Sequence, residues 1–234
     1  MSGMLAGKVA VVTGAGGGIG RGIALAMAAA MRGYKMILIM PDNLSVERRA
    51  SMAAYGAELI LTPSSGGGME FARDLATNMQ AEGRGKVLDQ FSNPDNPLAH
   101  FKTTGPELWE QTGGEITHFV SAMGTTGTIT GVSQFLKEKN PNIKLIAIEP
   151  PLGERVEGLR NLDEGYIPPI FENWHGVDLL DRKRVVRPRE SLEMTRRLVQ
   201  ECGIFAGISS GASLAGALKV ASEIEEGTIV FIVC

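Results

Sequence analysis

One junction constrains the fold more than any other stretch: an apolar, β-rich run ends in glycines and threonines just before a helix is expected. It covers Ser121–Gly131 and reads SAMGTTGTITG. Such a turn leaves backbone N–H groups and hydroxyls unpaired around a helix N-terminus, where they can bind a phosphate dianion. The alternative is an ordinary glycine and threonine turn with a helix N-cap. We interpret five residues of the junction as a phosphate cup: Gly124, Thr125, Thr126, Gly127 and Thr128.

The rest of the chain alternates short β-rich runs with helical stretches, which predicts βαβ units and parallel sheets of an α/β protein. We expect a smaller domain over residues 1–97 and a larger one over residues 98–234. The expected strands are 9–12, 35–40, 58–61, 86–88, 117–122, 144–149, 183–186 and 228–233. The expected helices are 18–32, 45–55, 68–82, 98–111, 128–138, 188–202 and 210–225.

Composition narrows the classes of function. The chain has 234 residues, 44% of them hydrophobic, and a formal net charge of -3, so no nucleic-acid-binding surface is indicated. The apolar run Ile23–Met31 is far shorter than the roughly 20 residues of a membrane span. The two cysteines and three histidines match no metal or redox spacing, and no signal peptide is apparent. We expect a cytoplasmic protein that binds neither metal, nucleic acid nor membrane.

Several further segments, taken together with the cup, match the motifs of one enzyme family and follow the order of that family from about Gly22 onward. They are Met40–Arg49, Tyr55–Glu58, Asp89–Pro97, Thr103–Glu107 and Gly207–Ala212. With these segments the chain resembles the cysteine synthases, especially their B-type branch. These are pyridoxal-phosphate (PLP) enzymes that make cysteine from an activated serine and sulfide by β-replacement.

The resemblance implies the fold of the type II PLP enzymes, like the tryptophan synthase β chain, with two open, parallel-sheet, Rossmann-like domains. It implies PLP as cofactor, O-acetylserine or O-phosphoserine as amino-acid substrate, and a homodimer. By the same resemblance the cup clamps the cofactor phosphate, Ser209 hydrogen-bonds the pyridine nitrogen, and Gln90 lies near the substrate. An alternative role for Ser209 is that of a helix N-cap.

Two family motifs are missing. The Schiff-base lysine of a Ser-x-Lys-Asp-Arg type segment has no counterpart, since none of the nine lysines lies in that context. The Thr-Ser-Gly-Asn-Thr loop for the substrate carboxylate should align with Gly17–Arg21, which reads GGIGR instead. We therefore assign no catalytic residue and expect an impaired or inactive enzyme with an incomplete fold, truncated at both ends.

The segment Gly7–Gly20 resembles the opening of a short-chain dehydrogenase, a likeness confined to about the first thirty residues. Glycines there would let the backbone approach a dinucleotide pyrophosphate. That family's Tyr-x-x-x-Lys is absent, because no lysine follows Tyr34, Tyr55 or Tyr166 at that spacing. Three functions stay open: an impaired cysteine synthase-like enzyme, a non-catalytic fusion or remnant, and an NAD(P)-binding oxidoreductase.

Overall fold

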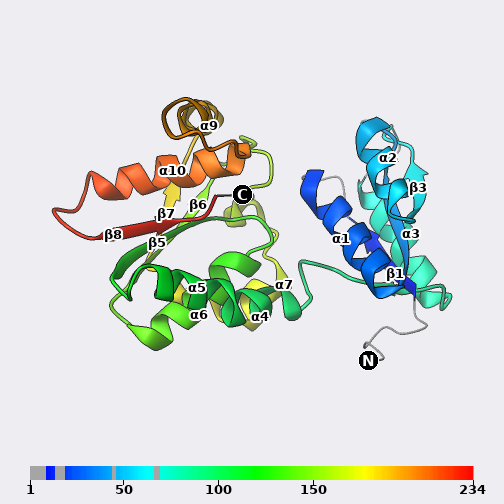
Figure 1. Ribbon diagram of the computed structural model, residues 1–234, viewed down its shortest axis with the longest axis horizontal. Helices are drawn as coiled ribbons and strands as arrows, with labels where there is room; N and C mark the ends of the chain where they lie inside the picture. Colours follow the sequence, from blue (N-terminus) through cyan, green and yellow to red (C-terminus); the bar gives the residue numbers. More distant parts are fainter. Residues whose placement is uncertain (1–8, 14–18, 44–45, 66–68, 234) are drawn as a thin grey trace. The chain divides into compact units, whose positions relative to one another are not determined.

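The computed structural model describes residues 9–13, 19–43, 46–65 and 69–233 (Figure 1). The chain divides into two compact units, Met1–Asp89 and Gln90–Cys234. The domain boundary that we expected between residues 97 and 98 falls inside helix α4 (Asp95–Lys102). This helix packs against α6 (Gly127–Lys139) and therefore belongs wholly to the second unit.

The first unit is built on a four-stranded parallel sheet in the order β3-β2-β1-β4. Its strands are β1 (Val9–Thr13), β2 (Lys35–Pro41), β3 (Glu58–Thr62) and β4 (Lys86–Val87). Its helices are α1 (Ile19–Arg32), α2 (Val46–Ala54) and α3 (Met69–Ala81). Gly56, at φ 83°, follows α2 as expected for a C-terminal glycine.

Strand β2 separates two small cores in the first unit. Met36, Leu38 and Met40 pack on one face with alanines of α1 and Met52 of α2. Ile37 and Ile39 pack on the other face with α3. Because helices cover both faces, residues 36–41 of this strand are all buried, as is usual in parallel sheets.

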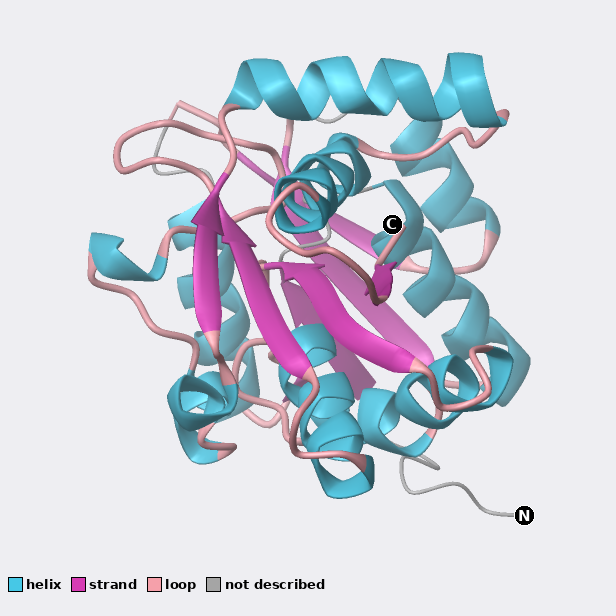
Figure 2. Ribbon diagram, turned by 90° about the vertical axis from the view of Figure 1, so that its left-hand side faces the viewer, coloured by secondary structure: helices cyan, strands magenta, loops and turns pink. Residues whose placement is uncertain are grey.

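The second unit has a second parallel sheet, ordered β7-β6-β5-β8. Its strands are β5 (Ile116–Ala122), β6 (Lys144–Glu149), β7 (Arg182–Val185) and β8 (Thr228–Phe231). Besides α4 and α6, its helices are α5 (Thr104–Gln111), α7 (Pro169–Asn173), α8 (Gly176–Leu179), α9 (Pro188–Cys202) and α10 (Ile208–Ala221). A 3₁₀ turn, η1, covers Leu162–Glu164. Figure 2 shows the strands with helices on both faces.

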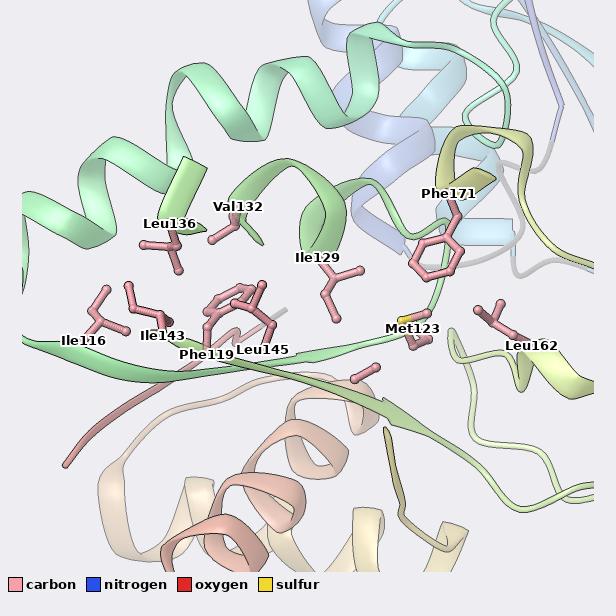
Figure 3. Close-up of a cluster of buried hydrophobic side chains, with 11 residues drawn as sticks. Ile116, Phe119, Met123, Ile129, Val132, Leu136, Ile143, Leu145, Leu162 and Phe171 are labelled. Atoms are coloured by element: carbon pink, nitrogen blue, oxygen red, sulfur yellow. The ribbon is translucent and has the colours of Figure 1, made fainter. Parts of the chain in front are cut away.

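Large side chains fill the core between α6 and this sheet (Figure 3). Phe119 of β5 and Leu145 of β6 face Ile129, Val132 and Leu136 of α6. The opposite face of the sheet packs against α10, mainly through valines, isoleucines and alanines. Successive residues of β5 and β6 thus point into different cores, which explains why both strands are largely apolar.

Several helices differ from the sequence prediction. The single helix expected over residues 98–111 is two helices, α4 and α5, separated at Thr103, where φ is -125° and ψ is -67°. Pro106 explains the break, because its ring would clash with the carbonyl four residues earlier in a continuous helix. Helix α10 ends at Ala221, four residues before the end that we expected, and α7 and α8 were not predicted.

Candidate functional site

The cup, Gly124–Thr128, lies where the connections of the second sheet diverge. Strand β5 pairs with β6 on one side and with β8 on the other. Helix α6 leaves β5 along one face of the sheet, whereas α10 leads to β8 along the other. In open parallel sheets, ligands bind at the carboxyl ends of the strands beside such a switch point. The fold therefore places the predicted phosphate cup where this architecture binds ligands.

The backbone of the cup presents N–H groups that the helix does not use. The first main-chain bond of α6 runs from the Thr130 N–H to the Thr126 carbonyl, at 3.0 Å. The N–H groups of the preceding helical turn are thus outside the intrahelical ladder. Thr126 caps the helix at φ 71°, and its hydroxyl donates back to the Thr125 carbonyl. No acidic side chain lies in the first turn of α6, so nothing in that turn opposes an anion.

Helix α4 holds the cup from the side. The Asn96 amide nitrogen lies 3.2 Å from Oγ1 of Thr125 and 2.7 Å from the main-chain carbonyl of Gln90. A Cβ on Gly127 would overlap the Asn96 carboxamide, and one on Gly131 would overlap the Pro97 carbonyl. The two glycines of α6 therefore allow the close approach of α4. Sequence reasoning missed Asn96, because no local signal links it to a threonine 29 residues away.

A histidine bridges two threonines beside the cup. His100 Nε2 lies 3.0 Å from Oγ1 of Thr128, and its Nδ1 lies 3.0 Å from Oγ1 of Thr104. Burial lowers the pKa of His100 below its ordinary value of 6.5, because desolvation penalises the charged ring. The neutral imidazole donates at one nitrogen and accepts at the other, so it ties Thr128 to the start of α5.

The segment at Gly158 and Arg160 contacts the start of the cup. The Arg160 N–H donates to the Met123 carbonyl at 2.6 Å, and a Cβ on Gly124 would lie 2.8 Å from the Gly158 carbonyl oxygen. The Arg160 guanidinium lies over the ring of Phe91, 4.8 Å from its centroid, and over that of Tyr166, at 5.1 Å. Gly158 and Arg160 therefore lie beside the cup.

Buried charge fixes this segment to the sheet. Glu149, at the carboxyl end of β6, is 3% exposed and pairs with Nζ of Lys183 at 3.1 Å. Nζ also lies 2.9 Å from Asp163 of η1. Partial burial alone would lower the pKa of Lys183, but hydrogen bonds to Asp163 and Glu149 outweigh it and raise that pKa. The lysine is thus held protonated, linking η1 to β6.

Ser209 and Gln90, the other predicted site residues, occupy defined places in the second unit. Helix α10 begins after Gly207, so Ser209 lies within its first turn and the N-cap alternative is wrong. Gly216 of α10 packs against Val120 and Ile148, near the carboxyl ends of β5 and β6. Ser209 precedes Gly216 by two turns, about 10 Å along the helix, which brings it to the carboxyl edge of the sheet.

The carbonyl of Gln90 is joined to the cup through Asn96, as described above. The structure therefore gathers the backbone of Gln90 and the cup into one hydrogen-bonded group. It also places Ser209 at the same edge of the same sheet. All of these residues follow Asp89, so the candidate site is built within the second unit.

The described ranges contain neither a cluster of metal-ligating side chains nor a membrane-spanning helix. There, no group of three or more His, Cys, Asp or Glu side chains is arranged to hold a metal ion. Within the same ranges, no helix is both long and apolar enough to cross a bilayer. The glycine turn that resembles a dehydrogenase falls on residues 14–18, outside the described part of the chain.

The residues of the cup fit a phosphate ester. The first-turn N–H groups of α6 are donors, the Thr125 and Thr128 hydroxyls lie beside them, and no carboxylate is present in that turn. A phosphate dianion carries only acceptor oxygens at its periphery, so donors are the groups it requires.

Comparison with known proteins agrees with this geometry. A family model described as pyridoxal-phosphate dependent enzyme matches residues 5–234. Cysteine synthase B of Pseudomonas aeruginosa is 54% identical over 213 residues, which is 91% of this chain and 70% of that protein. Cysteine synthase B of Escherichia coli is 52% identical, with 91% and 69% covered.

Solved structures also resemble the chain. The O-acetyl serine sulfhydrylase isoform 3 of Entamoeba histolytica superimposes with a TM-score of 0.83 at 33% identity, covering 97% of this chain and 68% of that one. A second structure, cysteine synthase from the same organism, gives a TM-score of 0.82 at 38% identity, covering 97% and 67%. The predicted type II fold is thereby confirmed, and the chain belongs to the family of pyridoxal-phosphate-dependent enzymes.

Proposed function

We propose that this chain is a cysteine synthase-like PLP protein that binds the cofactor but turns over poorly or not at all. The reaction of its lineage is β-replacement, in which O-acetylserine or O-phosphoserine and sulfide give cysteine. The hydrogen-bonded cup at the switch point of the second sheet carries the proposal. High identity to two cysteine synthases B supports the lineage.

In this proposal Gly124–Thr128 hold the cofactor phosphate through backbone N–H groups and hydroxyls. The Ser209 hydroxyl hydrogen-bonds the pyridine nitrogen of the cofactor, and Gln90 lies near the substrate. When bound, PLP supplies an electron sink for chemistry at the substrate α-carbon. A neutral hydroxyl at the ring nitrogen does not force protonation of the ring, which suits elimination and replacement at the β-carbon.

The availability of an amine decides turnover, and five of the eight lysines in the described ranges have acidic partners. These five are held in ion pairs: Lys35 with Glu58, Lys137 and Lys144 with Asp181, Lys183 with Glu149 and Asp163, and Lys219 with Glu190. Lys183 reaches the carboxyl end of β6, and its raised pKa keeps it protonated and non-nucleophilic. Loss of the covalent catalytic nucleophile of a serine protease costs about a million-fold in rate.

The test measures cofactor attachment and turnover separately on the purified chain. The chain is incubated with PLP, reduced with borohydride and mapped by peptide mass spectrometry, while cysteine formation is followed with O-acetylserine and sulfide. We expect reversible PLP binding, no stoichiometric phosphopyridoxyl adduct on a single lysine, and a rate equal to that of free PLP. A single stoichiometric lysine adduct together with turnover would contradict the proposed impairment.

Dimerisation, truncation relative to the family and a cytoplasmic location remain proposals. We propose that the chain associates as a homodimer, as the family resemblance implies, which sedimentation would test. Truncation relative to the family and a cytoplasmic location stay predictions. The dehydrogenase-like function has no support beyond residues 7–20, and the family match from residue 5 includes that segment.

A further inference from the structure

Asn96, in the first turn of α4, has an amide orientation that its neighbours determine. One neighbour of its side-chain nitrogen is the Gln90 carbonyl, at 2.7 Å. A carbonyl oxygen can only accept a hydrogen bond, so the amide nitrogen and not the amide oxygen must face it. The second N–H of the same amide is then directed to Oγ1 of Thr125, at 3.2 Å.

This orientation decides what the Thr125 hydroxyl can do. Its oxygen accepts from Asn96 and also faces the Gly127 N–H, at 3.4 Å. A hydroxyl has two accepting lone pairs and one proton, so both accepting positions are taken and the proton is left to donate. Thr125 is 9% exposed, and no described residue accepts from this hydroxyl. The remaining proton is thus available to a ligand in the cup.

We infer that Asn96 is a positioning residue that fixes the Thr125 hydroxyl as a donor into the cup, and so favours an acceptor-only group such as a phosphate dianion. The inference rests on the proposed binding of PLP phosphate at this site. It also gives a second reason for the sequence of the cup: Gly127 is glycine because its Cβ would overlap the Asn96 carboxamide. The glycine accommodates Asn96 in addition to the ligand.

Asn96→Asp tests the donor role, because a carboxylate keeps the size of the side chain but cannot donate. The Thr125 proton would then turn toward the carboxylate and away from the cup. Equilibrium dialysis of the full chain would compare PLP with pyridoxal, which lacks the phosphate. We expect PLP affinity to fall roughly ten- to hundredfold, as for loss of a hydrogen bond to a charged group, with pyridoxal affinity unchanged.

Two controls separate this effect from added charge. Asn93→Asp introduces the same charge just before α4, where the side-chain oxygen of Asn93 accepts from the Asp95 N–H and an aspartate can do the same. It should change the ratio of PLP to pyridoxal affinity less than about twofold, as for a surface substitution. In a Thr125→Val background, Asn96→Asp should lose most of its effect, because the proton it redirects is gone.

The outcomes are distinguishable. If the unmodified chain binds PLP no better than pyridoxal, the proposed function fails. If the unmodified chain favours PLP and Asn96→Asp leaves that preference intact, the inference about Asn96 fails. The same holds if Asn96→Asp weakens PLP binding equally in the parent chain and in the Thr125→Val background.

A steric test keeps the inference open to refutation even if Asn96→Asp does not fold. Gly127→Ala should lower the thermal midpoint in the parent chain, because its Cβ meets Asn96. In an Asn96→Ala background the same change should cost markedly less, and PLP binding should remain detectable. An equal decrease of the thermal midpoint in both backgrounds would show that contact with Asn96 is not the reason that residue 127 is glycine.

Discussion

The two units have the same sheet topology, but their described cores differ, and the candidate site lies in the second unit. Both sheets place their first strand second from one edge, in the orders β3-β2-β1-β4 and β7-β6-β5-β8. The loop after β5, the first strand of the second unit, stands at the switch point of its sheet. In the second unit this loop is the cup, fastened by Asn96 and His100. The sheet topology therefore determines where the site lies, whereas the packing of α4 supplies the side chains that hold the cup.

The cores of the two units also differ. Among the residues whose burial is described, the first unit buries mainly methionine and alanine in and around β2, including Met40, Met79 and Ala76. The second buries phenylalanine, isoleucine and leucine between α6 and its sheet, with Phe119 and Leu136 fully inaccessible. Methionine fills irregular space with a flexible chain, whereas branched and aromatic side chains specify one packing. We expect the second unit to be the more stable and the more sensitive to truncation of a core side chain.

Phe119→Ala should have the largest effect on stability. Phe119 is 0% exposed in the main core of the second unit, and such a truncation costs about 3–5 kcal/mol. Both tryptophans, Trp109 and Trp174, lie in this unit, so their fluorescence reports its unfolding by denaturant. Phe205→Ala is the matched control, because Phe205 is 93% exposed, and it should stay within about 0.5 kcal/mol. Equal effects of the two variants would contradict the core assignment.

Met40→Ala should produce a smaller loss, confined to the first unit. Met40 is fully buried, and we expect about 2 kcal/mol, the low end for such truncations, because neighbouring methionines can readjust. Far-UV circular dichroism should shift to lower denaturant while tryptophan fluorescence keeps its midpoint. The control is Met31→Ala, at a side chain 82% exposed. If both probes shifted together, the two units would unfold as one and the contrast between their cores would have no consequence for stability.

Much of the fold could be predicted because its signals are local. Short β-rich runs located the eight described strands, although β7 reads RKRV and is not apolar. Pro188 and Gly203 bracket α9, with the proline at its first position and the glycine just after its end. The break between α4 and α5 also had a local signal in Pro106, which the expected continuous helix disregarded. Helix α7 also begins with a proline, Pro169, but α7 and α8 have only 5 and 4 residues and depend on packing of Ile170, Phe171 and Gly176.

The candidate site was predictable only in part, for a physical reason. The cup is a contiguous motif, so composition and resemblance located it. Asn96 and His100 act across the fold, from α4 onto residues 28 or 29 positions later, and their roles follow from which hydrogen bonds the packing leaves available. For Gly127 the sequence suggested close approach of a phosphate, but a Cβ there first meets Asn96. A Gly127→Val variant would thus disturb packing before it reported on the ligand.

The smallest expected effect is the pH dependence of stability that the histidines cause. It concerns the second unit alone, because all three histidines lie after Asp89. Burial lowers the pKa of His100 below 6.5. Desolvation, with Lys144 and Arg182 nearby, likewise lowers the pKa of His118. Well above pH 6.5 both rings are neutral in the folded and unfolded chain, so neither contributes a slope. As pH falls through 6.5 the unfolded chain takes up protons first, so stability decreases until the folded pKa is reached.

We therefore expect the tryptophan-detected free energy of unfolding to decrease as pH falls below 6.5, and His100→Asn to remove part of that decrease. Protonation would make both ring nitrogens donors, so Thr128 and Thr104 would both have to accept from His100. His118→Asn should remove the other part, whereas His175→Asn, at an exposed ring beside Asp178, serves as the control. The part of the far-UV circular dichroism transition that reports on the first unit should keep its denaturant midpoint over the same pH range. If the free energy of unfolding of His100→Asn kept the same pH slope as the parent chain, the hydrogen-bonded bridge from Thr104 through His100 to Thr128 would not resist protonation. The pH dependence of the second unit would then not arise from the residues beside the cup.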